Sequence, residues 1–135
     1  MSFARQALPF AGALFVAGVV VQVFLAGLGV FNDPATFLTH RDFGYTLGML
    51  TLVLLILAIV ARQSRRVIGL SALLLLLFAL QSLFVAIRPA PLAGLHPVNG
   101  FLILLVAIVV TREAWLSRAM PDRATSPSVI AADVA

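Results

Sequence analysis

Two apolar runs flank a short basic link in the middle of the chain: FGYTLGMLTLVLLILAIVA at residues 43–61, RQSRR at 62–66, and VIGLSALLLLLFALQSLFVAI at 67–87. Neither run contains a charged residue. Each has close to the 20 or so helical residues that cross the hydrocarbon core of a bilayer. The arginines of the link belong outside that core, so the segment predicts two membrane-spanning helices joined on one side of a membrane.

Two further apolar stretches lie outside this hairpin. The first covers residues 9–31, and it is too long for the apolar region of a cleaved signal peptide. The second is clearly apolar only over residues 98–110, and it reaches spanning length if the helix starts near Leu92 or continues through Trp115. We therefore expect helices at about 9–31, 34–62, 67–87 and 94–115 within one domain, residues 1–116. The polar residues 117–135 are expected to form a disordered cytoplasmic tail.

The composition excludes a soluble globular domain. Hydrophobic residues make up 62% of the 135 and charged residues 10%, whereas soluble domains carry about 25% charged residues. The chain has no cysteine, which excludes disulfides, thiolate metal sites and the cysteine attachment of c-type haem. Any cofactor must therefore be held by histidine, methionine or oxygen ligands.

The arginines indicate the topology. Two of the nine, Arg41 and Arg88, fall on one side of the predicted membrane, and the other seven fall on the opposite side: Arg5, Arg62, Arg65, Arg66, Arg112, Arg118 and Arg123. By the positive-inside rule both termini are cytoplasmic, in a bacterial-type cytoplasmic membrane. Because the arginines are scattered between apolar runs, they do not form a nucleic-acid-binding face.

A weak internal repeat relates the two halves of the chain. V-Q-V-F-L-A at 21–26 and L-Q-S-L-F-V-A at 80–86 place Gln22 and Gln81 in outgoing helices. The motif H-x-x-x-G then occurs once in each returning helix, at His40 and at His96. We expect an all-α fold, an integral membrane antiparallel four-helix bundle built of two parallel-repeat helical hairpins.

The two histidines are the strongest candidates for chemistry. Both are expected near the outer ends of their helices, with Gly44 and Gly100 one turn further in on the same faces. Glycines in membrane helices commonly permit close helix packing, and the alternative is that a flat ligand lies against them. A single interfacial histidine is usually only a hydrogen bonder, but one iron atom between His40 and His96 would supply both imidazoles with a partner.

Nearby residues allow several interpretations. Arg41 and Arg88 could pair with two propionates or could merely snorkel to the interface. Zinc is disfavoured, because two histidines with Asp33 or Asp42 do not make a tetrahedral set. For Gln22 and Gln81 we prefer a role in interhelical hydrogen bonds. The predicted helices have no acid or arginine at mid-membrane, so the sequence does not favour a transport path. Glycines on the first helix could serve a dimer contact or packing within the bundle: Gly12, Gly18, Gly27 and Gly29.

On H-R-D-F-G at 40–44 and L-H-P-V-N-G-F-L at 95–102, the chain resembles one four-helix half of a haem A synthase. That resemblance implies that His40 and His96 are the axial ligands of one b-type haem. The family has a glutamate three residues before the histidine in its catalytic half, and here that residue is Phe37. The resemblance therefore does not extend to oxygenation of a haem substrate, and an enzyme is not expected.

The chain also resembles a group of uncharacterised small bacterial four-helix membrane proteins, which implies no activity. We expect a membrane protein that binds haem b near the extracytoplasmic face and works in electron transfer, haem handling or redox sensing. The alternative is a cofactor-free accessory subunit or small-solute-binding bundle. The expected partners are membrane lipid and a homodimer or larger redox complex, with no nucleic acid.

Overall fold

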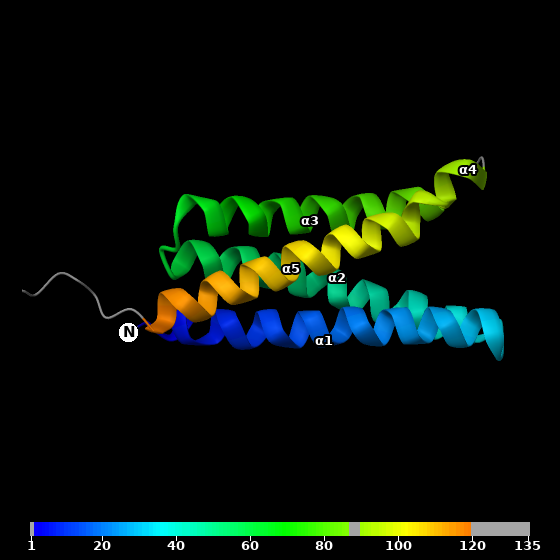
Figure 1. Ribbon diagram of the computed structural model, residues 1–135, viewed down its shortest axis with the longest axis horizontal. Coiled ribbons are helices and arrows are strands. Elements are labelled where there is room, and N and C mark those ends of the chain that lie inside the picture. The colour runs from blue at the N-terminus through cyan, green and yellow to red at the C-terminus, as the bar shows by residue number, and fades with distance from the viewer. Residues whose placement is uncertain (1, 87–89, 120–135) are drawn as a thin grey trace, which may run out of the picture.

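The computed structural model describes residues 2–86 and 90–119, in which every regular element is a helix (Figure 1). The helices are α1 (Phe3–Phe31), α2 (Thr36–Val60), α3 (Arg65–Ala86), the short α4 (Ala90–Ala93) and α5 (Leu95–Ala119). This confirms the all-α prediction. Four segments are long and apolar enough to cross a membrane: Phe3–Phe31, Thr36–Val60, Arg65–Ala86 and Pro91–Arg118.

The helix bounds differ from the expected ones mainly at the two termini. Helix α1 begins at Phe3, six residues before the predicted start, because the Ser2 hydroxyl accepts a hydrogen bond from the Arg5 amide and caps the helix. Helix α5 continues to Ala119, so residues 117–119 of the predicted tail are helical. The rest of the predicted tail, residues 120–135, lies outside the described residues.

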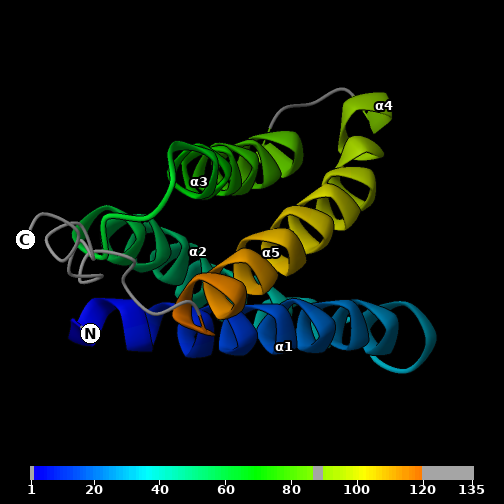
Figure 2. The ribbon, with the colours of Figure 1, turned by 60° about the vertical axis from the view of Figure 1, so that its left-hand side comes forward.

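The long helices contact one another in a closed order. Contacts join α1 with α2, α2 with α3, α3 with α5, and α5 with α1. In Figure 1, α1 lies along the bottom and α3 along the top, and α5 runs diagonally from beside α3 at its start to the level of α1 at its end. Figure 2 shows the same oblique crossing of α5 toward α1. We call α1–α2 the first hairpin and α3–α5 the second hairpin.

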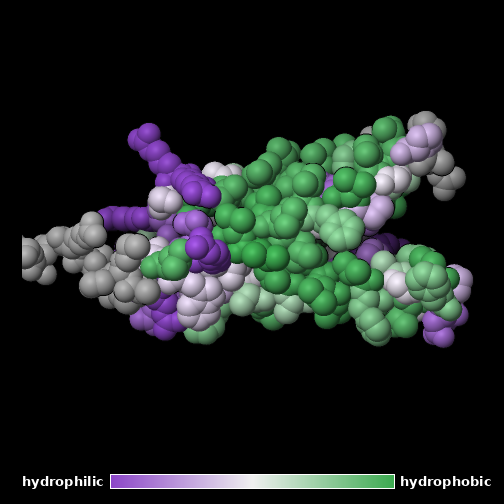
Figure 3. Space-filling view, viewed as in Figure 1, coloured by the Kyte–Doolittle hydropathy of each residue, from purple (hydrophilic) through white to green (hydrophobic). Residues whose placement is uncertain are grey.

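The chain order gives the two ends of the molecule different chemistry. The start of α1, the α2–α3 link and the end of α5 form what we call the arginine end: Arg5, Arg62, Arg65, Arg66, Arg112 and Arg118. The opposite end, which we call the histidine end, carries His40 and His96 near the starts of α2 and α5. Figure 3 shows an apolar band between two ends that are more hydrophilic.

The apolar residues divide between a narrow core and a wide outer surface. Leu8, Phe15, Leu54, Leu74 and Ile103 are buried at no more than 2% exposure. Phe24, Met49, Ile56 and Leu105 belong to a much larger set of apolar side chains that point outward. A hydrophobic exterior around a thin core is what a lipid solvent permits and water does not.

Glycines allow the closest approaches between helices. A Cβ atom at Gly12 would collide with the Thr111 hydroxyl of α5, and one at Gly48 would lie 2.9 Å from the Phe78 ring of α3. By contrast, nothing lies within 4 Å of such an atom at Gly27. Gly12 and Gly48 therefore set how closely the two hairpins pack, as expected of glycines at helix–helix contacts.

The α2–α3 link turns at a residue with an unusual backbone conformation. Arg62 has a φ of 51°, in the left-handed region. The Gln63 amide donates to the Ala58 carbonyl at 3.0 Å and the Arg62 amide donates to the Ile59 carbonyl at 2.9 Å. This pair of bonds is the Schellman arrangement, in which glycine is usual at the residue that Arg62 occupies.

We expect Arg62→Gly to stabilise the fold by about 1 kcal/mol, because a side chain in the left-handed region costs about 1–2 kcal/mol and glycine removes that cost. Thermal unfolding in detergent measures the change. Arg62→Ala is the matched control, since it removes the same charge but keeps Cβ. Equal stability of the two variants would show that charge, not backbone conformation, is responsible.

Candidate histidine site

His40 is placed by the start of α2 and by the neighbouring helix α1. The Asp33 carboxylate accepts a hydrogen bond from the Ala35 amide at 2.9 Å, just before α2 begins at Thr36. One turn later, the Nδ1 atom of His40 lies 3.1 Å from the Gln22 carbonyl oxygen. The imidazole is partly buried. The first hairpin therefore holds its histidine through the backbone of its other helix.

His96 is held in the same way in the second hairpin. It lies in the first turn of α5, where Pro97 is compatible with the helix because that amide needs no partner. Its Nδ1 atom lies 3.1 Å from the Gln81 carbonyl oxygen of α3. The glutamine and histidine positions that the sequence repeat singled out thus make the same contact twice.

These contacts determine which ring nitrogen of each histidine carries a proton. A carbonyl oxygen only accepts hydrogen bonds, so each Nδ1 must be the protonated donor. The neutral ring then has its lone pair on Nε2, the nitrogen left to accept a proton or bind a metal ion. A carbonyl at Nδ1–H is a usual second partner of a metal-binding histidine, where it fixes the tautomer and orients the ring.

The two rings meet between helices that are not neighbours in the closed order. The centroids of His40 and His96 lie 6.1 Å apart, with an interplanar angle of 62°. Rings in edge-on contact generally have centroids about 4.5–7 Å apart, so the two imidazoles touch one another directly. The structure therefore brings the histidines of the two hairpins together at the histidine end.

The protein's own ligands to a metal here would be the two histidines alone. No group of three or more His, Cys, Asp or Glu side chains able to hold a metal ion occurs in residues 2–86 and 90–119. Asp42 forms an ion pair with Arg41 at 2.8 Å. The described residues therefore offer two histidines here and no third such side-chain ligand beside them.

The two glycines of the H-x-x-x-G motifs face glutamine side chains. A Cβ atom at Gly44 would lie 2.7 Å from Nε2 of Gln22, and one at Gly100 would lie 3.5 Å from Nε2 of Gln81. Each glycine thus makes room for the amide of the other helix in its hairpin. This contact supports the helix-packing interpretation of Gly44 and Gly100, and the amides separate both positions from a ligand lying directly on the backbone.

The side-chain amide oxygens of Gln81 and Gln22 differ in their hydrogen bonding. Asn99 of α5 donates to Oε1 of Gln81 at 2.6 Å and to the Leu77 carbonyl at 2.8 Å. Asn99 is three residues after His96, and the residue three after His40 is Phe43. Oε1 of Gln22 is buried without a hydrogen-bond partner in the described part of the chain. The sequence analysis missed Asn99, although comparing the residues three after each histidine would have found it.

The remaining predicted site residues have different outcomes. Arg41 is exposed, and its Nε donates to Asp42 at 2.9 Å, so it lies at the rim with its charge already paired. Arg88 lies outside the described residues.

Phe37, which stands where the resemblance has a glutamate, packs edge-on to His40 at 6.4 Å between centroids and fills the space beside Gly29. It adds apolar surface next to the imidazole rather than a charge.

The surface is indented at the histidine end, and the core below it contains an aromatic contact. Figure 3 shows the surface hollowed at the histidine end between the two hairpins, with hydrophilic residues inside the hollow. Deeper in the molecule, Phe78 of α3 packs against Gly48 and stacks edge-on with Phe15 at 6.2 Å. This ring contact joins α1 and α3 in the core.

Comparison with known proteins identifies no activity. Residues 22–87 match a family model described as a family of unknown function, DUF6220. The matched segment begins at Gln22, contains His40 and Gln81, and ends before His96. No curated protein and no solved structure matches the chain.

Proposed function

We propose that this chain is an integral membrane four-helix bundle of two repeated hairpins that binds one b-type haem between His40 and His96. The observation that carries the proposal is the paired imidazoles, 6.1 Å apart, each with Nδ1 on a glutamine carbonyl. That geometry leaves both Nε2 atoms as ligands. The resemblance to one half of a haem A synthase supports the same two ligands.

The proposed membrane placement follows from the exposed surface. Four spanning-length helices carry an apolar exterior, and six arginines gather at one end. By the positive-inside rule the arginine end is cytoplasmic, and the histidine end faces outward. Burial of the histidines in such a bundle needs hydrogen-bond or metal partners, because an unsatisfied imidazole in hydrocarbon costs free energy.

The chain's own residues would bind, orient and shield the group. His40 and His96 supply two nitrogen ligands, and the Gln22 and Gln81 carbonyls fix the ring tautomers. Phe37 supplies apolar surface beside His40 that limits water. Haem bound in this way supplies one-electron chemistry, whose potential depends on axial ligands and burial. Electron transfer, haem handling and redox sensing all fit that chemistry, whereas oxygenation lacks an acid at Phe37.

A second candidate is a cofactor-free bundle acting as an accessory subunit or small-solute binder. It is favoured by the amide contacts, since Gly100, Gln81 and Asn99 form a packed cluster that needs no ligand. The same cluster supports the histidine in the first candidate. The presence of haem therefore separates the two functions.

A visible spectrum of the purified chain tests the proposal. Protein expressed in haem-replete cells and purified in mild detergent should show a Soret band and, on reduction, the split bands of a low-spin b-type haem. We expect about one haem per chain in a pyridine haemochrome assay. Colourless protein that takes up no added haemin would overturn the proposal and favour the cofactor-free bundle.

Reporter fusions test the orientation independently. A fusion after Ala135 should report a cytoplasmic location, and one in the 89–95 loop should report an extracytoplasmic location. The opposite pattern would place the histidine end inside the cell.

A further inference from the structure

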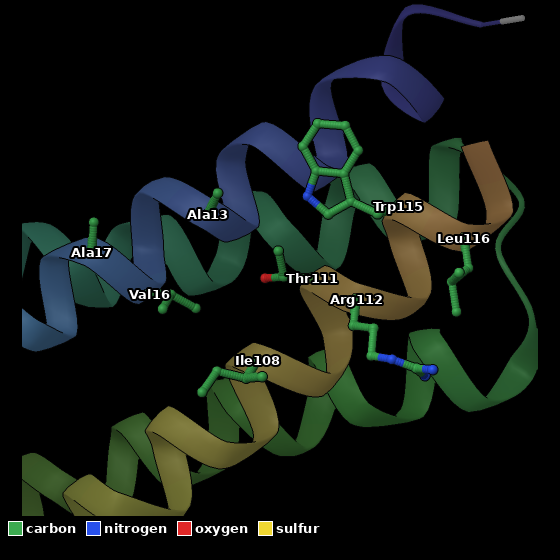
Figure 4. Close-up of a pocket in the computed structure, with 8 residues that line it drawn as sticks. All are labelled: Ala13, Val16, Ala17, Ile108, Thr111, Arg112, Trp115 and Leu116. Atoms are coloured by element: carbon green, nitrogen blue, oxygen red, sulfur yellow. The ribbon is translucent and has the colours of Figure 1, made fainter. Parts of the chain in front are cut away.

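A groove between α1 and α5 opens at the arginine end, far from the histidines. It has a volume of about 530 Å³, and Ala13, Ala17, Ile108, Arg112 and Trp115 are among its lining residues. Figure 4 shows Val16 and Ile108 between the two helices, with Trp115 reaching toward α1. The volume lies within the range of about 300–1,000 Å³ typical of small-molecule sites.

The groove is shallow and has apolar walls because of the side chains that line it. The small side chains of Ala13 and Ala17 leave space on the α1 wall. Thr111, which also lines the groove, donates its hydroxyl to the Ala107 carbonyl at 2.7 Å, so it presents no free donor. The α5 wall from Ile108 to Leu116 covers eight residue steps, or about 12 Å of helix. The groove is therefore a lengthwise slot suited to a hydrocarbon chain.

The open end of the slot is basic. Arg112 lines the groove and its side chain is 69% exposed. The Arg118 guanidinium lies over the Phe10 and Trp115 rings at 5.1 and 5.3 Å from their centroids, which holds a second cation beside the same opening. Glu113 is the only acid among the described residues of the arginine end, and it contacts both Arg66 and Arg112. The opening thus keeps a net positive charge.

We propose that this groove binds one anionic phospholipid, with an acyl chain along the α1–α5 slot and the headgroup phosphate at Arg112 and Arg118. The inference rests on the proposed membrane insertion and is independent of haem. An apolar slot flanked by arginines matches a lipid chain ending in a phosphate, and the lining includes Trp115, a residue type enriched where membranes meet water. A second copy of the chain would place like charges together at the same opening.

Native mass spectrometry of the purified chain in detergent tests the site. With dioleoylphosphatidylglycerol and dioleoylphosphatidylcholine at equal concentration, we expect one bound lipid and about a fivefold preference for the anionic one. This ratio corresponds to about 1 kcal/mol, the contribution of one basic side chain, because Glu113 offsets the charge of Arg112 and leaves one net positive charge from Arg112 and Arg118. Inorganic phosphate should not compete, since it lacks the acyl chain.

Matched variants locate the binding. Ala13→Phe and Ala17→Phe fill the slot from exposed positions and should lower retention of both lipids at least fivefold, while Ala72→Phe on the exposed face of α3 should not. Arg112→Gln should remove most of the preference for phosphatidylglycerol, while Arg65→Gln, outside the groove lining, should retain it. Gel filtration and helicity confirm that each variant is folded.

Three results would overturn the inference. Full lipid retention by the filled variants would place the lipid elsewhere, and equal binding of both lipids would contradict selection of an anionic headgroup by the arginines. A change in oligomeric state on filling the slot, with unchanged lipid binding, would assign the groove to a second copy of the chain. Release of the chain from membranes by alkaline carbonate would instead contradict membrane insertion itself.

Discussion

Replacing either His40 or His96 by alanine is expected to lower the haem content of the purified chain at least tenfold. Each substitution removes one of the two proposed protein ligands, and loss of even a supporting group costs about 10–100-fold in metal affinity. The split bands of low-spin haem should disappear in both variants, because a low-spin iron needs both axial nitrogens. Haem-to-protein ratio and the reduced spectrum are measured on one preparation.

Two control variants separate ligand loss from general damage. Thr39→Ala changes an exposed residue next to His40 and should leave haem content unchanged. Gln22→Ala should also retain haem, because the group that holds Nδ1 of His40 is the backbone carbonyl and not the side chain. Full haem content in both histidine variants would contradict the proposed ligation.

Introducing leucine at Gly12 is expected to disrupt the packing between the two hairpins. A Cβ atom at this position already collides with the Thr111 hydroxyl of α5, and leucine adds three more carbon atoms. Overpacking of this kind costs about 1–3 kcal/mol, and more where the backbone must shift. We expect a lower unfolding temperature in detergent and a broadened gel-filtration peak, with or without haem.

Gly27→Leu is the matched control, in the same helix and with the same added side chain. Nothing lies within 4 Å of a Cβ atom at Gly27, so leucine there should pack outward without loss of stability. If both variants were equally stable, the close approach of α1 and α5 at Gly12 would not determine the packing of the hairpins.

The helices were predictable because an apolar run of fixed length has few alternatives in a chain with so little charge. Each of the predicted ranges 9–31, 34–62, 67–87 and 94–115 overlaps one long helix of the described residues, and the errors lie at the ends. The early start at Phe3 depends on one hydroxyl, that of Ser2, and the late end at Ala119 continues through polar residues that hydropathy does not register. The short helix α4 has no periodicity to detect.

At the candidate site, the sequence predicted positions and not contacts. The repeated H-x-x-x-G motif identified two histidines that the structure brings together, because equivalent positions in two like hairpins fall at the same depth. The carbonyl partners could not be predicted, since every residue carries a carbonyl and none has a sequence signature. The sequence also could not decide what lies against Gly44 and Gly100. A glycine leaves space beside the helix, but its position in the sequence does not show whether a side chain or a ligand fills that space.

The difference between Asn99 and Phe43 makes the two hairpins chemically unequal, although both make the same histidine-to-carbonyl contact. Gln81 has its amide oxygen satisfied, while that of Gln22 is buried without a partner in the described part of the chain, at a cost of about 1–3 kcal/mol. The first hairpin therefore keeps a buried acceptor that needs a hydrogen-bond donor, and the second hairpin does not at the equivalent glutamine. The likeness of the two hairpins ends at this atom, and a ligand bound at the proposed site would face two unlike halves.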